Sequence, residues 1–137
     1  MAFQNPSDDT IKALLSRPQT VAVVGCSPDP QRDSHRIAQL LKAKGHRVIP
    51  VNPGHQTMIN ETCYASLRDI PEQVDMVDIF RRSEHVAPIV DEAIEAGAKI
   101  IWMQLGVIDE EAAVKAQQAG LTVVMDRCPA IEYRRLF

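Results

Sequence analysis

Residues 20–37, TVAVVGCSPDPQRDSHRI, constrain the fold more than any other part of the chain. Residues 20–24 are a short β-branched run suited to a strand covered on both faces, and Gly25 follows where the chain must turn. A helix is predicted to begin near Ser34, with Ser34 as its N-cap. The free N–H groups and positive dipole end of that helix form a ready anion site. A ligand-binding turn and an ordinary strand-to-helix connection both remain open from this segment alone.

The turn lacks the residues that identify the commonest nucleotides. A dinucleotide-binding turn reads G-x-G-x-x-G, with a carboxylate about 20 residues later that holds the ribose hydroxyls. Here Ser27 and Pro30 stand at the second and third glycine positions, and the next predicted strand is followed by Asn52 instead of an acid. The Gly-Lys-Ser/Thr ending of a P-loop is also absent. The sequence therefore disfavours NAD and argues against hydrolysis of ATP or GTP.

Length and composition predict one soluble domain over residues 1–137. The chain has 137 residues, of which 45% are hydrophobic and 24% charged, and a net charge of −3, which does not support a nucleic-acid or membrane partner. The N-terminus resembles no signal peptide, and no apolar run approaches the length of a membrane span, so we expect a cytoplasmic protein. The three cysteines lack metal-ligand spacing and suit a reducing compartment, and no metal site is predicted.

Predicted strands and helices alternate along the chain. Strands are expected at residues 20–24, 46–51, 76–80, 100–103 and 121–125, with a short extra strand at 56–60 and a helical turn at 64–70. Helices are expected after Ser7, and at residues 34–44, 87–97, 109–120 and 129–137. This order predicts an α/β fold with a single Rossmann-like, doubly wound parallel sheet of five or six strands flanked by helices. Ligands bind such sheets at the carboxyl ends of the strands.

Five signatures at those strand ends carry a family resemblance: VGCSPDP, VNPG, DIFRRSE, AGAKIIWMQLG and DRCPAIE. In this order they resemble the small stand-alone CoA-binding proteins of the YccU type over residues 11–137. The chain is also similar to the N-terminal domain of the succinyl-CoA synthetase α chain. The catalytic phosphohistidine of that synthetase lies in a domain that has no counterpart here, so the resemblance does not imply acyl-CoA ligase chemistry.

The resemblance implies a set of CoA-binding residues. It places Gly25, Cys26 and Ser27 near the CoA phosphates, with Ser34 and His35 at the helix start, and Asn52, Pro53, Gly54 and His55 beside the adenosine. Phe80, Arg81, Gln104 and Gly106 would border the adenine or pantetheine groove. Arg32 is a candidate for neutralising a phosphate, although exposed charges often form only a solvated face. The synthetases carry a lysine where this chain has His55.

Two classes of function follow. The first is a non-catalytic module that binds CoA or acyl-CoA for sensing, carriage or regulation, because no nucleophile, base and electrophile are evident as a set. The second is a small enzyme acting on a CoA thioester through Asp126, Cys128 or His55. A nicotinamide-binding redox switch is a third reading, opposed by Asn52 in place of an acid. A protein partner or a homodimer stays open.

Two expectations concern single residues in the turn. A bulky residue at Gly25 is expected to impair ligand binding before it impairs folding. The Cys26 thiol is expected to be more reactive than that of Cys63, because a nearby helix N-terminus favours the thiolate. The alternative is that Cys26 is a small residue chosen for space.

Overall fold

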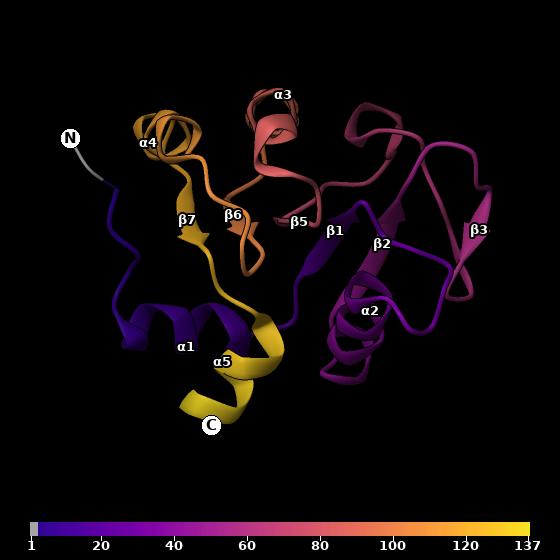
Figure 1. Ribbon diagram of the computed structural model, residues 1–137, viewed down its shortest axis with the longest axis horizontal. Helices are drawn as coiled ribbons and strands as arrows, with labels where there is room; N and C mark the ends of the chain where they lie inside the picture. The colour runs from indigo at the N-terminus through magenta and orange to yellow at the C-terminus, as the bar shows by residue number, and fades with distance from the viewer. Residues whose placement is uncertain (1–2) are drawn as a thin grey trace.

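A five-stranded parallel sheet forms the centre of the molecule in the computed structural model, which describes residues 3–137. Its strands are β1 (Thr20–Val24), β2 (Arg47–Val51), β5 (Met76–Ile79), β6 (Ile100–Met103) and β7 (Thr122–Met125). They lie in the order β2-β1-β5-β6-β7, and every neighbouring pair is parallel (Figure 1). The apolar runs of the sequence thus become strands that are buried on both faces, as predicted.

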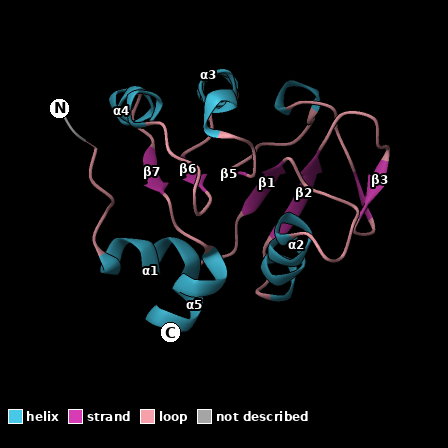
Figure 2. Cartoon of the chain, viewed as in Figure 1, coloured by secondary structure: helices cyan, strands magenta, loops and turns pink. Residues whose placement is uncertain are grey.

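Helices cover both faces of the sheet. The helices α1 (Asp8–Ser16), α2 (Asp33–Ala43) and α5 (Pro129–Leu136) lie below the sheet in Figure 2, whereas α3 (Val86–Glu95) and α4 (Glu110–Gln118) lie above it. The buried apolar residues form two clusters, one on each face. This arrangement confirms the Rossmann-like, doubly wound α/β fold with five strands in its main sheet.

Most helix boundaries agree with the sequence, and one predicted cap is wrong. The Ser7 hydroxyl caps α1 by accepting a hydrogen bond from the Thr10 N–H, as expected. The helix α2, however, has Arg32 as its N-cap residue, without a side-chain capping bond. Ser34 lies one residue inside the helix, and its Oγ accepts a hydrogen bond of 2.9 Å from the Ser27 N–H. Its hydroxyl therefore closes the loop before α2 and does not cap the helix.

The segment after β2 is a small hairpin instead of one extra strand. Strands β3 (Thr57–Met58) and β4 (Glu61–Thr62) pair antiparallel, apart from the main sheet. Lys42 of α2 donates a hydrogen bond of 2.8 Å to the Ile59 carbonyl and forms an ion pair of 3.0 Å with Glu61, which holds the hairpin on α2. A short 3-10 helix, η1 (Leu67–Asp69), lies within the predicted helical turn, and a second, η2 (Ser83–His85), precedes α3.

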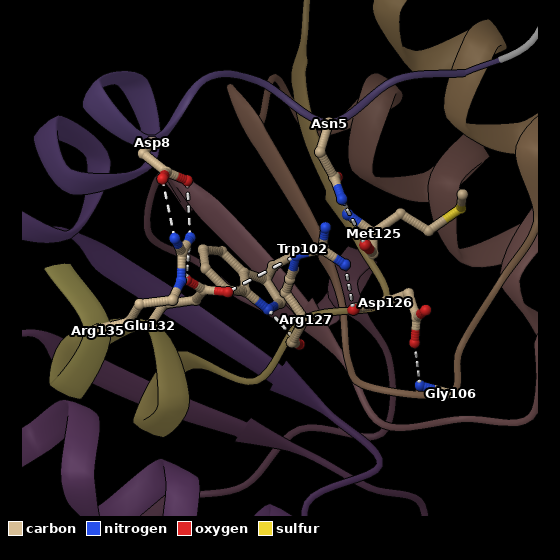
Figure 3. Close-up of polar contacts among 9 residues, drawn as sticks. All are labelled: Asn5, Asp8, Trp102, Gly106, Met125, Asp126, Arg127, Glu132 and Arg135. Carbon is tan, nitrogen blue, oxygen red and sulfur yellow. Dashed lines mark hydrogen bonds and ion pairs between the residues drawn. The ribbon is translucent and has the colours of Figure 1, made fainter.

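A polar network fixes α5 to the body of the protein (Figure 3). The Arg135 guanidinium donates to both carboxylate oxygens of Asp8 in α1, over 2.7 and 2.8 Å, and to Glu132 over 2.9 Å. Glu132 is only 2% exposed, and it also lies 3.7 Å from the guanidinium of Arg127. The indole N–H of Trp102 in β6 donates to the Arg127 carbonyl. The chain between β7 and α5 is thereby held in one position.

Between residues 3 and 137, no helix combines the length and the apolar character that crossing a membrane requires. In the described part of the chain, no three His, Cys, Asp or Glu side chains gather as metal ligands would.

Candidate functional site

The strand order creates a crevice between the ends of β1 and β5. From β1 the chain moves through α2 to β2 on one side, and from β5 it moves through α3 to β6 on the other. The helices α2 and α3 cover opposite faces of the sheet, so neither closes the space beyond the carboxyl ends of β1 and β5. Such a switch point is where open α/β sheets bind their ligands.

Gly25 packs the turn after β1 against the end of β5. Its φ of +84° is a left-handed conformation, and a β-carbon at this position would lie 2.4 Å from the Phe80 carbonyl oxygen and 3.0 Å from Cδ of Arg81. Any larger residue must therefore push the β1 turn away from β5. This contact changes the expectation for Gly25, because a valine is now predicted to disturb folding together with binding.

Asn52 ties the end of β2 to the same turn. Its side-chain N–H group donates a hydrogen bond of 2.7 Å to the Cys26 carbonyl, and its backbone N–H donates to the Tyr64 carbonyl. An acid at this position could not donate the first bond, so the absence of a ribose-binding carboxylate has a structural cause as well.

The Cys26 side chain points into the core and not towards the crevice. Cys26 is fully buried in the cluster below the sheet, and burial raises the pKa of its thiol to about 12, with Cys63 and Asp78 adding to the rise. Burial also raises the pKa of the Cys63 thiol. The prediction of a reactive Cys26 is therefore wrong, because the side chain is fully buried in this cluster and burial favours the protonated thiol.

The start of α2 presents backbone donors at the edge of this crevice. The first N–H that bonds within the helix is that of Arg36, to the Arg32 carbonyl. The N–H groups of Asp33, Ser34 and His35 make no hydrogen bond within residues 3–137. The His35 ring lies 3.0 Å from the Ser27 carbonyl through Nδ1, so it supports the loop. These three free donors can bind an anion.

Two cavities flank the crevice and share Phe80 and Arg81. The β2-side cavity has a volume of about 450 Å³ and is lined by Gly25, Asn52, Pro53, Ser66, Leu67, Phe80, Arg81 and Glu92, among others. The α5-side cavity has a volume of about 790 Å³, and its lining includes Arg36, Ile37, Leu40, Phe80, Arg81, Gln104, Leu105, Gly106, Cys128, Ile131 and Arg134. Both cavities therefore border the end of β5.

The structure brings together half of the residues predicted for the site. Gly25, Asn52, Pro53, Phe80, Arg81, Gln104 and Gly106 line these cavities, whereas Cys26, Ser27, Arg32, Ser34, His35, Gly54 and His55 line neither. Sequence reasoning missed Glu92 and Ser66 in the first cavity and Leu105, Ile131 and Arg134 in the second. Leu105 and Ile131 lie within the signatures AGAKIIWMQLG and DRCPAIE, whereas Glu92 and Arg134 lie outside the five signatures and reach the carboxyl edge through the packing of α3 and α5.

Two lining residues carry buried oxygens without a partner. One carboxylate oxygen of Glu92 and the amide oxygen of Gln104 have no hydrogen bond among residues 3–137. Glu92 lines the β2-side cavity, and Gln104, which is 7% exposed, lines the α5-side cavity. Because an unsatisfied buried acceptor is unfavourable, each of these oxygens suits a donor supplied by a ligand.

Comparisons with known proteins identify a family, related sequences and related folds. The sequence matches the family described as CoA binding domain over residues 19–134. It is 38% identical to the uncharacterized protein YneT of Bacillus subtilis over 126 residues, which are 92% of this chain and 93% of that protein. The fold is similar to that of a hypothetical protein from Pyrococcus horikoshii, with a TM-score of 0.91, 36% identity and 99% of each chain covered.

A longer relative is an enzyme. The chain is 34% identical over 96 residues to the ADP-forming acetate–CoA ligase II of Archaeoglobus fulgidus, covering 67% of this chain and 14% of the ligase. The similarity thus extends over a small part of that enzyme. The stand-alone proteins, in contrast, match over nearly their whole length. The chain therefore belongs to the family of CoA-binding domain proteins and is related to the corresponding part of ADP-forming acetate–CoA ligases.

Proposed function

We propose that the protein binds CoA or an acyl-CoA without transforming it, as a sensing, carrying or regulatory module. The ligand would lie along the carboxyl edge of the sheet and occupy both cavities. The observation that carries this proposal is that Phe80 and Arg81 border both cavities, so the two cavities lie next to each other at the carboxyl edge of the sheet, where an elongated ligand would bind. Membership of the CoA-binding family supports CoA as that molecule.

The adenine, the phosphates and the pantetheine arm of CoA each have a candidate hydrogen-bonding partner in the site. The adenine amino group is a donor for the unpaired Glu92 oxygen in the β2-side cavity. The phosphates suit the free N–H groups at the start of α2 and the exposed guanidinium of Arg81. The pantetheine arm carries amide N–H groups that suit Gln104 in the α5-side cavity.

The residues considered for catalysis do not form a catalytic set. The Asp126 carboxylate accepts a hydrogen bond of 2.7 Å from the Gly106 N–H, which gives it a structural task (Figure 3). His55 is exposed and lines neither cavity, and only Cys128 faces the α5-side cavity. This separation favours binding over turnover. An assay of thioester hydrolysis and acyl transfer on a panel of acyl-CoAs tests it, and steady turnover would favour the enzyme instead.

Arg81 offers the sharpest binding test. It is exposed, and no carboxylate of residues 3–137 lies within ion-pair distance of it, so its removal should cost little stability. Arg81→Ala should weaken CoA binding about tenfold or more, since hydrogen bonds to charged groups contribute about 1.5–3 kcal/mol. Arg17→Ala is the matched control, because Arg17 is also exposed but lies at the amino end of β1. Equal CoA affinity of the two variants in calorimetry would contradict the proposed site.

A further inference from the structure

The α5-side cavity has an apolar interior that extends well beyond the crevice. Ile37 and Leu40 of α2 form one wall, and Ala130 and Ile131 of α5 form the other. Leu105, in the loop after β6, also lines the cavity and is 57% exposed, and Ile131 is 40% exposed. The volume of about 790 Å³ is within the range of about 300–1,000 Å³ that is typical of small-molecule sites. Exposed apolar side chains around a cavity of this size indicate an apolar ligand group.

Positive charges surround this apolar interior. Arg36, Arg81, Arg82 and Arg134 line the cavity together with one acidic residue, Asp33, and all five are exposed. Arg36 is paired with Asp33 and Arg82 with Glu84, but within residues 3–137 no carboxylate pairs with Arg81 or Arg134. The cavity therefore suits an amphipathic ligand with anionic groups outside and an apolar chain inside.

One polar group inside the cavity indicates the chemistry of the segment that joins the anionic and apolar parts of such a ligand. The amide oxygen of Gln104 is buried and unpaired, although the residue lines the cavity at the end of β6. An amide N–H from a ligand would satisfy it, whereas a purely hydrocarbon ligand would leave it unpaired. The pantetheine arm of CoA supplies amide N–H groups between its phosphates and its thioester.

The walls of the cavity are held in place before any ligand arrives. Figure 3 shows that Asp126 binds the Gly106 N–H of the loop after β6, while Arg135 and Glu132 fix α5 to Asp8. The Trp102 indole also holds the chain before α5 through the Arg127 carbonyl. A preformed apolar site loses little conformational entropy when a chain enters it.

We propose that this cavity holds the acyl chain of an acyl-CoA, and that the preferred ligand carries an apolar acyl group. The inference rests on the proposed CoA binding and adds the class of acyl group. The apolar side chains of α2 and α5 in the cavity wall favour an apolar acyl group.

Calorimetric titration with CoA and with its acetyl, butyryl, hexanoyl and octanoyl thioesters tests the proposal. Affinity should rise by up to about fourfold for each added methylene, the factor that corresponds to about 0.8 kcal/mol, until the cavity is filled. Leu105→Asn should reduce this dependence on chain length, so that it weakens the binding of octanoyl-CoA more than the binding of free CoA. Ile108→Asn is the matched control, since Ile108 lies in the same loop and is 48% exposed but does not line the cavity.

Alkylation of Cys128 with N-ethylmaleimide gives an independent readout. Cys128 is a free, partly buried thiol in the cavity wall, whereas Cys26 and Cys63 are buried elsewhere. Octanoyl-CoA should slow the alkylation of Cys128 more than free CoA does, and peptide mapping would identify the labelled cysteine. Equal protection by the two ligands would count against an acyl chain in the cavity.

The outcomes separate this inference from the proposed function. Binding of CoA with the same affinity at every chain length would overturn the acyl site and leave CoA binding intact. If neither CoA nor any thioester binds, both proposals fail. A dependence on chain length that Leu105→Asn and Ile108→Asn reduce equally would show that the chain contacts some other surface, and would also overturn the proposal.

Discussion

The side-chain amide of Asn52 donates a hydrogen bond of 2.7 Å to the backbone carbonyl of Cys26, and so joins the end of β2 to the turn after β1. We predict that Asn52→Ala destabilises the fold by about 1–2 kcal/mol, because it removes this bond and leaves the carbonyl without its donor. The variant should also bind CoA more weakly, since the turn loses its support. Denaturant unfolding and calorimetry measure the two effects, and a variant with wild-type values for both would refute the assigned role.

Asp78 should make the protein less stable as the pH rises. Its carboxylate oxygens are buried in β5 without a partner in residues 3–137, and burial raises its pKa well above the usual value. The unfolded chain releases this proton near pH 4, whereas the folded chain retains it, so stability declines from about pH 4 upwards.

The variant Asp78→Asn isolates this effect. Relative to the variant, the parent should lose up to about 1.4 kcal/mol for each pH unit between about pH 4 and the raised pKa of Asp78. Free energies of unfolding at several pH values measure the difference, in which the other titrating groups cancel. Parallel profiles for the two proteins would mean that Asp78 titrates normally.

His46 should produce the opposite trend on the acid side. Its Nδ1 accepts a hydrogen bond of 3.1 Å from the Gln19 N–H, its Nε2 lies 2.8 Å from the Tyr133 hydroxyl, and burial lowers its pKa. The unfolded chain takes up a proton near pH 6.5 while the folded chain stays neutral, so this contribution is present above pH 6.5 and is lost below it. Compared with His46→Gln, the parent should therefore lose stability from pH 7 to pH 5. A constant difference over that range would contradict the expected shift.

We predict that Glu92 lowers the stability of the ligand-free protein and contributes to its affinity for CoA. Because one of its oxygens is buried and unpaired, Glu92→Leu is predicted to maintain or raise the free energy of unfolding in the absence of ligand. The same variant should bind CoA about fivefold to tenfold more weakly, since the loss of one hydrogen bond corresponds to about 1 kcal/mol. Asp91→Leu is the control, because Asp91 lies next to Glu92 in α3 but pairs with Lys115, outside the two site cavities. A greater loss of affinity in the control would remove Glu92 from the site.

The sheet could be predicted from the sequence because its strands are apolar runs between clear turn residues, as with residues 100–103, which match β6 in full. The β3–β4 hairpin could not be predicted from the sequence. Its turn places Ile59 and Asn60 at φ values of 49° and 60°, but it lacks the Asn-Gly pattern that usually indicates such a turn. Its stability comes from contacts with Lys42, which lies 17 residues away from Ile59.

Site residues could be predicted from the sequence where the end of a strand alone places them. They could not be predicted where the direction of the side chain decides whether the residue reaches the site. Gly25 and Asn52 follow their strands directly and Arg81 lies two residues after β5, so the topology alone brings them to one edge. Cys26 also follows β1, but its side chain turns into the core. Leu105 and Ile131 meet in the α5-side cavity only because α5 packs back on α1 through Arg135 and Asp8.

The backbone amides of the glycines provide the most direct test of where CoA binds. Gly25, Gly54 and Gly106 follow β1, β2 and β6 at the carboxyl edge, whereas Gly45, Gly97 and Gly120 precede β2, β6 and β7 at the opposite edge. In a titration followed by ¹H–¹⁵N NMR spectra, CoA should shift the signals of the first three and leave the other three nearly unchanged, and NAD should cause much smaller shifts. Shifts centred on Gly45, Gly97 and Gly120, or no shifts with CoA, would contradict a CoA site at the carboxyl edge of the sheet.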